Sequence, residues 1–213
     1  MKFLVSVSIG LLVLVSTATG AAATTFTLSK FSVNAYESGD NGLGIGWDLA
    51  DNLSLPKTFT LPEVGAHTTF HLFDIWTWET AVNYDDTIKR KIEANFGFSS
   101  PDFSGSVGGS TFGLSLFGLF DRGKVQWSNP TIFSYGTDPI GALSVSLSDE
   151  TFNAGFFDLK SGASYGATVS AKFALVKEGG TSVPDASIMF LLGPALIGLG
   201  ILGKRKHRLA GHQ

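Results

Sequence analysis

Hydrophobic and polar residues alternate with a period of two along most of the chain between residues 24 and 178. In the clearest stretch, 165–175, apolar residues occupy the odd positions, and Gly166, Thr168, Ser170 and Lys172 lie between them. Similar alternation occurs over 88–98 and 143–147. Successive side chains of a β-strand point to opposite faces, so this pattern predicts half-buried strands.

Clusters of turn-forming residues divide this pattern into about nine or ten short strands. The segments 70–78 and 112–120 are apolar almost throughout and predict central strands. The alternation changes parity near Ser29 and Lys30, which predicts a β-bulge. We therefore expect an antiparallel β-sandwich over residues 24–178, with a closed β-barrel as the alternative.

The N-terminal segment does not follow the alternating pattern. Lys2 supplies a positive charge, Phe3–Val15 is an apolar run, and Ala21 and Ala23 provide small residues at the spacing of a cleavage site. This order predicts a helical signal peptide over residues 1–23 that signal peptidase removes after Ala23. The body of the protein is therefore expected to be exported.

The C-terminal segment also lies outside the pattern. A linker over 179–182 precedes the motif Val183-Pro184-Asp185-Ala186-Ser187, an uncharged run over 188–202 and a short tail over 209–213. The run has 15 residues, fewer than the roughly 17–25 of a stable transmembrane helix. It predicts a transient hydrophobic helix, held with its end in the cytoplasm by a basic cluster of Lys204, Arg205, Lys206 and Arg208.

The order of motif, apolar run and basic cluster resembles the PEP-CTERM sorting signal of exported proteins in Gram-negative bacteria. The usual motif is Val-Pro-Glu-Pro, and here Asp185 and Ala186 replace the Glu and the second Pro. The resemblance covers residues 183–208. It implies cutting near Pro184 by an exosortase after transient anchoring in the inner membrane. It further implies delivery to the cell surface or extracellular matrix, and association with exopolysaccharide and biofilm. An ordinary C-terminal membrane anchor is the alternative.

Charge and composition limit the classes of partner that the body of the protein is expected to bind. The chain contains no cysteine, so no disulfide or thiolate metal site can form. Without Lys2, Asp185 and the four basic residues of the tail, 17 acidic and 10 basic residues remain, a net charge of −7. This acidic balance disfavours nucleic acid and anionic lipid as partners.

Two short motifs overlap near residue 165. Leu159, Gly162 and Tyr165 have the spacing of a tyrosine corner, in which a Tyr hydroxyl binds the backbone of the preceding loop. The segment 162–166 also matches Gly-x-Ser-x-Gly, the nucleophile elbow of α/β-hydrolases. That elbow needs a helix after the serine, whereas a strand is expected here, so we predict the corner and no catalytic serine.

Two groups of residues are candidates for ligand binding. Asp85 and Asp86, with other loop carboxylates at Asp40, Asp48 and Asp51, could supply oxygen ligands to Ca²⁺. Solvated turn residues are the favoured interpretation, and no other cofactor is expected. Trp76 and Trp78 share one strand face beside carboxylates, which suits stacking on sugars. Burial in the core is the favoured interpretation of these tryptophans too.

No nucleophile–base pair, metal cluster or phosphate loop emerges from the sequence. We therefore expect a non-enzymatic protein of the cell surface or extracellular matrix. The alternatives are a secreted carbohydrate-binding module and a glycoside hydrolase, whose two carboxylates would meet only in the fold.

Overall fold

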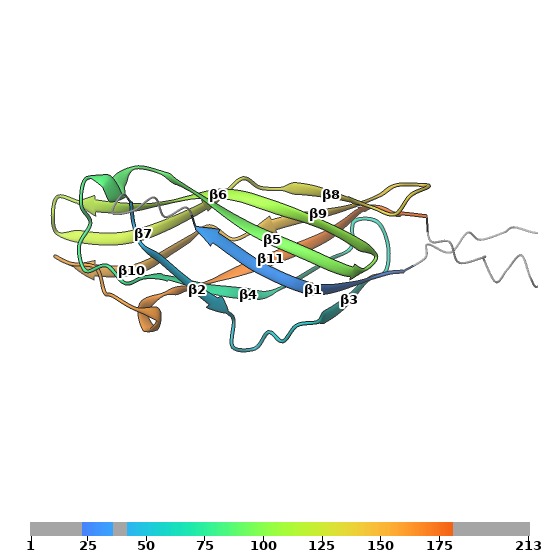
Figure 1. Ribbon diagram of the computed structural model, residues 1–213, viewed down its shortest axis with the longest axis horizontal. Coiled ribbons are helices and arrows are strands. Elements are labelled where there is room, and N and C mark those ends of the chain that lie inside the picture. Colours follow the sequence, from blue (N-terminus) through green and yellow to red (C-terminus); the bar gives the residue numbers. More distant parts are fainter. Residues whose placement is uncertain (1–22, 36–41, 181–213) are drawn as a thin grey trace, which may run out of the picture.

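The computed structural model describes residues 23–35 and 42–180, and these form one elongated all-β body (Figure 1). Eleven strands make two antiparallel sheets that pack against each other. Both ends of the described chain lie at one end of the long axis, and the β6–β7 hairpin lies at the other (Figure 1). The arrangement is sandwich-like, which agrees with the predicted all-β class.

The first sheet has six strands. Their order is β10 (Glu150–Phe156), β7 (Phe120–Trp127), β6 (Asp102–Leu116), β5 (Arg90–Ser100), β1 (Thr24–Ala35) and β3 (Lys57–Leu61). The segments 70–78 and 112–120 were both expected to form central strands. The prediction is correct for all of 112–116, which belong to the interior strand β6, but residues 117–119 form the turn to β7.

The second sheet has five strands. Their order is β2 (Ile45–Leu49), β4 (His67–Thr77), β11 (Ala167–Lys177), β9 (Gly141–Leu147) and β8 (Thr131–Tyr135). Two single-turn 3₁₀ helices, η1 (Asp85–Thr87) and η2 (Ala163–Tyr165), lie outside the sheets. Across the described ranges no helix is long or apolar enough to span a bilayer.

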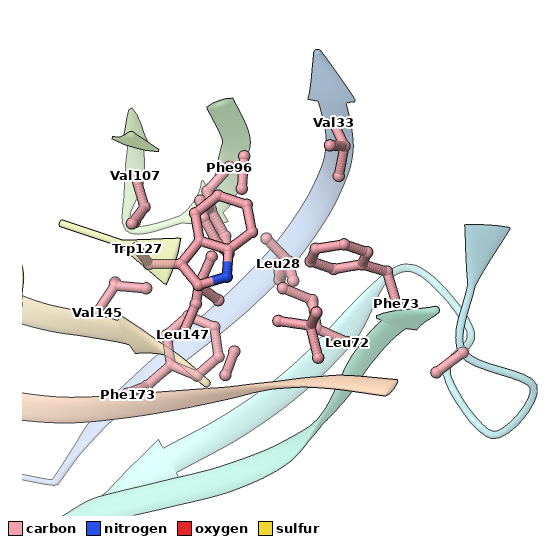
Figure 2. Close-up of a cluster of buried hydrophobic side chains, with 14 of the residues drawn as sticks. Leu28, Val33, Leu72, Phe73, Phe96, Val107, Trp127, Val145, Leu147 and Phe173 are labelled. Carbon is pink, nitrogen blue, oxygen red and sulfur yellow. The ribbon is translucent and has the colours of Figure 1, made fainter. Parts of the chain in front are cut away.

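The core lies between the sheets and is built from the faces that the alternation predicted. Ile92, Ala94, Phe96 and Phe98 of β5 are buried against residues of the facing sheet, among them Phe173 of β11. Figure 2 shows part of this cluster, in which the ring of Trp127 lies 6.1 Å from that of Phe73 in an edge-to-face arrangement. Burial of these side chains is the main driving force for the fold.

The predicted bulge is confirmed. The pairing of β1 with β5 shifts register between Thr27 and Lys30, which restores an apolar residue to the core face on each side of the irregularity. Phe26 and Leu28 before it and Val33 after it are all buried.

A buried tyrosine fixes the end of the last strand. The Tyr135 hydroxyl donates to the Lys177 carbonyl at 3.1 Å and accepts from the Gly179 N–H at 3.3 Å. Its ring is almost fully buried and meets Phe26 edge to face at 5.2 Å. The chain therefore stays attached to the sheet through Gly179, where the linker was predicted to begin.

Candidate functional site

Two indole rings lie on the outer face of the five-stranded sheet. In β4, Phe73, Ile75 and Thr77 face the core, so Trp76 faces outward, and Trp78 follows with the same parity. Trp78 is 51% exposed and Trp76 is half-buried. The favoured prediction of core burial is therefore wrong for both residues. The two other tryptophans differ, because Trp127 is buried and Trp47 packs against the core.

Glycines on the neighbouring strands make room for these rings. A methyl group at Gly44 would lie 2.6 Å from Cε2 of Trp78, and one at Gly46 would lie within 2.3 Å of Nε1 of Trp76. Gly166, before β11, lies against Trp76 from the other side. Trp76 therefore rests over bare backbone of β2, and Trp78 rests over that of Gly44, directly before β2. We call this surface, formed by Gly44, Gly46, Trp76 and Trp78, the indole platform.

Polar groups line one side of the indole platform. Asp48 of β2 pairs in register with Asp74 of β4. This pair lies two residues along the strands from Gly46 and Trp76, and on the same face of the sheet. The Thr168 hydroxyl donates a hydrogen bond to the Asp74 carboxylate. Carboxylate oxygens and a hydroxyl beside planar rings provide the acceptors and apolar faces that a sugar ring can use.

The strand that carries the platform is held by Asn153 of β10, a residue of the opposite sheet. Its side-chain Oδ1 accepts from the Thr77 N–H at 2.9 Å, and its Nδ2 donates to the Thr77 carbonyl at 3.4 Å. Nδ2 also donates to the carbonyls of Lys160 and Gly162. Asn153 is fully buried with a φ of 54°, a conformation that Asn tolerates better than most residues.

The predicted tyrosine corner is absent. Tyr165 lies in η2 and is 52% exposed, with the Lys160 ammonium 5.4 Å from its ring centroid. The loop is instead attached by Asn153, by the Ser161 hydroxyl, which donates to the Trp78 carbonyl at 2.7 Å, and by the Gly162 N–H, which donates to the Thr77 carbonyl at 2.8 Å. The Asn153 side-chain amide thus holds the backbone of this loop, the role that the motif predicted for the Tyr165 hydroxyl.

The carboxylates proposed for calcium take part in backbone contacts. The Asp85 carboxylate accepts from the Gly42 N–H at 3.1 Å, and the Asp86 carboxylate accepts from the Asn83 N–H at 2.7 Å. Asp86 is 1% exposed, so the favoured interpretation as a solvated turn residue is wrong for it. Among residues 23–35 and 42–180, no three His, Cys, Asp or Glu side chains are placed to share a metal ion. Asp40 lies outside the described residues.

The Asp86 side chain interacts with that of Glu79, which follows Trp78. The two carboxyl groups share a hydrogen bond, and the Gly44 N–H donates to Glu79. Burial raises the pKa of both groups above their ordinary values of 4.5 and 3.8, and the nearby Asp85 charge raises both further. Glu79 therefore connects the acidic group to the backbone beneath Trp78.

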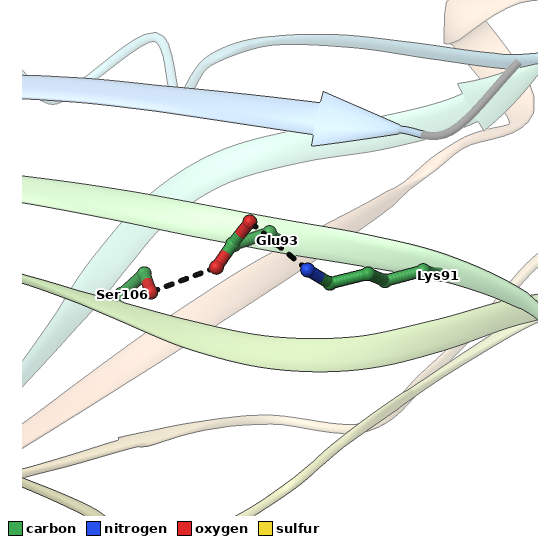
Figure 3. A network of polar contacts seen from close by, with 3 residues as sticks. All are labelled: Lys91, Glu93 and Ser106. Atoms are coloured by element: carbon green, nitrogen blue, oxygen red, sulfur yellow. Dashed lines mark hydrogen bonds and ion pairs between the residues drawn. The ribbon is translucent and has the colours of Figure 1, made fainter.

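The outer face of the six-stranded sheet carries a different polar network (Figure 3). Glu93 accepts a hydrogen bond from the Ser106 hydroxyl at 2.8 Å and forms an ion pair with Lys91 at 3.4 Å. The Ser106 hydrogen bond and the Lys91 charge lower the pKa of Glu93. This network is exposed to solvent and offers no cavity, so we do not assign it to ligand binding.

The predicted processing signals lie almost wholly outside the described residues. This holds for the signal peptide up to Ala22, for the motif 183–187, for the apolar run and for the basic cluster. Ala23 is described and is exposed, directly before β1. Comparison of the chain with protein-family models, with curated proteins and with solved structures finds no match.

Proposed function

We propose that this chain is an exported, non-enzymatic β-sandwich protein of the cell surface or extracellular matrix that binds polysaccharide through its indole platform. The observation that carries the proposal is that Trp76 and Trp78 rest over Gly46 and Gly44 on the outside of the sheet. Exposed indoles cost free energy in water, and stacking on the apolar face of a sugar recovers it.

The platform is suited to an extended polymer. Trp76 and Trp78 are two residues apart on one strand face, so their attachment points are separated by about 7 Å. Asp48 and Asp74 continue the same face beyond Trp76. A sugar chain that follows β4 would thus meet two rings and then hydrogen-bond acceptors, without any need for an enclosed pocket.

The rival proposal, a glycoside hydrolase with two carboxylates, finds less support. Such enzymes place the two carboxyl groups about 5–9.5 Å apart with the substrate between them. The carboxyl groups of Glu79 and Asp86 are hydrogen-bonded to each other, and the buried Asp86 side chain is inaccessible to substrate. Their raised pKa values follow from burial, which also occurs in structural pairs.

Sorting forms the second part of the proposal. Signal peptidase removes residues 1–23, and an exosortase of the PEP-CTERM type cuts near Pro184 after the apolar run has held the chain in the inner membrane. Mass spectrometry of the exported form should detect neither Phe3–Val15 nor Ile188–Leu202. An exported protein that still carries the C-terminal run would contradict exosortase processing and support ordinary anchoring.

One incubation separates binding from catalysis. The full chain is mixed with the exopolysaccharide of the producing organism, sedimented with it, and the supernatant is assayed for new reducing ends. Co-sedimentation without new reducing ends is the expected result. New reducing ends would support the hydrolase, and absence of both would leave a purely structural role and contradict the binding proposal.

A further inference from the structure

The β6–β7 hairpin and the end of β10 lie at the end of the molecule opposite the chain termini (Figure 1), and they carry a cluster of exposed apolar side chains. The exposed fractions of these side chains range from 38% to 96%. We call this surface the apolar tip; it consists of Leu116, Phe117, Leu119, Phe120, Phe156 and Phe157. Six neighbouring apolar side chains exposed together indicate an interaction surface, because solitary ones are common but clusters are not.

The apolar tip is held in place by the backbone. Leu116 pairs with Phe120, and Phe120 pairs with Phe156, so these three side chains form one row across three strands. The rings of Phe120 and Phe156 lie 5.0 Å apart, and the Phe157 N–H donates to the Leu119 carbonyl at 2.7 Å.

Two phenylalanines of the tip have left-handed backbone conformations. Phe117 has a φ of 56° and is 96% exposed, and Phe157 has a φ of 70°. This conformation costs a residue with a Cβ roughly 1–2 kcal/mol, and the exposed ring adds a hydration cost. A glycine would avoid both costs, so these phenylalanines indicate a surface that is maintained for contact.

Cationic side chains lie directly behind the row of apolar residues. Arg122 and Lys124 share the outer face of β7 with Phe120, about 7 and 14 Å further from the tip. On the same sheet face, the Lys89 ammonium lies 5.0 Å from the centroid of the Phe112 ring. Although the body has an excess of acidic residues, this face therefore combines aromatic rings at its end with positive charges behind them.

We propose that the apolar tip docks on the surface of an anionic lipid bilayer. Aromatic rings would enter the boundary between headgroups and acyl chains, and Arg122 and Lys124 would reach the negative headgroups. The net charge of −7 opposes long-range attraction, but salt screens it beyond about 10 Å, so the local cations decide the contact. This site is separate from the indole platform and does not depend on polysaccharide binding.

A second copy of the chain is a less suitable occupant. A two-fold contact between two tips would bring Arg122 and Lys124 close to the same residues of the other copy. Like charges facing each other would oppose this contact. A fluid lipid surface also adapts to a protruding hairpin, whereas the tip of another rigid copy cannot.

The test uses the absence of cysteine in the native chain. A single cysteine is introduced into the full chain as Phe117→Cys at the tip, or as Val64→Cys at an exposed control position in the β3–β4 turn, and is labelled with an environment-sensitive dye. Each labelled chain is titrated with vesicles of phosphatidylcholine alone or with about one-third phosphatidylglycerol. The dye is local, so membrane insertion of the terminal apolar runs does not imitate a response at the tip.

The expected result is a blue shift and lipid-quencher accessibility at residue 117 with anionic vesicles only, and no change at residue 64. The double variant Arg122→Gln with Lys124→Gln should weaken the response at least tenfold. The control double variant, Lys172→Gln with Lys177→Gln, makes the same charge change at exposed positions of β11 and should leave the response unchanged. No response at residue 117, or equal responses at both positions, would overturn the proposal. A concentration-dependent shift without lipid would indicate a second copy and would overturn it too.

Discussion

The side-chain amide of Asn153 pairs with both backbone groups of Thr77, which lies 76 residues earlier in the chain and in the opposite sheet. Thr77 is the residue between Trp76 and Trp78, so this contact fixes the strand end that carries both indoles. Asn153 is fully buried, and the partners of its side-chain amide are backbone groups. The buried contact between Asn153 and Thr77 therefore positions the indole platform on the surface.

Asn153→Ala should lower the free energy of unfolding by roughly 3 kcal/mol, because it leaves the buried Thr77 N–H without its partner and removes the amide's hydrogen bonds to the carbonyls of Thr77, Lys160 and Gly162. Asn153→Gly removes the same hydrogen bonds but tolerates the positive φ, so it should cost about 1 kcal/mol less than Ala. Urea unfolding followed by tryptophan fluorescence measures both. A change in the free energy of unfolding of less than about 0.5 kcal/mol is the usual effect of a surface substitution. Changes that small in both variants would contradict the structural role assigned to Asn153.

The stabilising hydroxyl that the sequence motif assigned to Tyr165 should instead be that of Tyr135. Tyr135→Phe leaves the Lys177 carbonyl and the Gly179 N–H unpaired and should cost about 1–2 kcal/mol. Tyr165→Phe changes an exposed ring and should lie within about 0.5 kcal/mol of the parent. The same unfolding experiment compares them, and a larger loss for Tyr165→Phe would restore the tyrosine corner.

Much of the fold could be predicted from the sequence, because burial on one sheet face imposes a period of two. Leu143, Val145 and Leu147 are buried as their alternation indicates, and the parity change near Ser29 and Lys30 located a real bulge. The count of nine or ten strands was too low by one or two, because strands of only five residues, such as Lys57–Leu61 and Thr131–Tyr135, are too short for the alternation to stand out.

The surface of the candidate site could not be predicted in the same way. Parity shows that Trp76 and Trp78 share a face, but it does not show which face the second sheet covers. The signal that could have decided it is Gly44 and Gly46, because a glycine opposite a tryptophan leaves room for a ring to lie flat over the sheet. Asn153 lies beside Phe152 in a strand, and its pairing with Thr77 depends on how the two sheets approach.

The acidic pair makes stability depend on pH in a defined direction. The pKa values of Glu79 and Asp86 are raised in the folded protein, so the folded state binds protons more tightly than the unfolded chain. The contribution of this pair to the free energy of unfolding is greatest at pH values below the ordinary pKa values near 4. It is lost as the pH rises through the raised pKa values of the folded protein. Glu79→Gln should therefore raise the Tm at pH 7 and reduce the loss of stability between pH 4 and 7.

Glu93→Gln is the matched control for this experiment. The pKa of Glu93 is lowered, so its contribution is present at neutral pH and is lost as pH falls. Thermal unfolding at several pH values compares the parent with both variants. Parallel curves for the parent and Glu79→Gln would contradict the assigned coupling of Glu79 and Asp86.

Gly44→Ala should impair polysaccharide binding although it replaces neither tryptophan. The added methyl group would lie 2.6 Å from the Trp78 ring, so the ring must leave its position over the backbone of residue 44. Gly108→Ala is the control, since a methyl group there meets no atom within 4 Å. Affinity electrophoresis in gels that contain the polysaccharide should show reduced retardation for Gly44→Ala only, and equal retardation of both variants would refute the packing argument.

The central claim is that polysaccharide binds on the indole platform, and calorimetric titration of the full chain with purified exopolysaccharide tests it most directly. Trp78→Ala should weaken binding at least tenfold, which corresponds to about 1.4 kcal/mol, while the fold remains intact because Trp78 is half exposed. Tyr84→Ala, which removes an 86% exposed ring elsewhere, should bind like the parent. Equal affinity of the parent and Trp78→Ala would contradict the account.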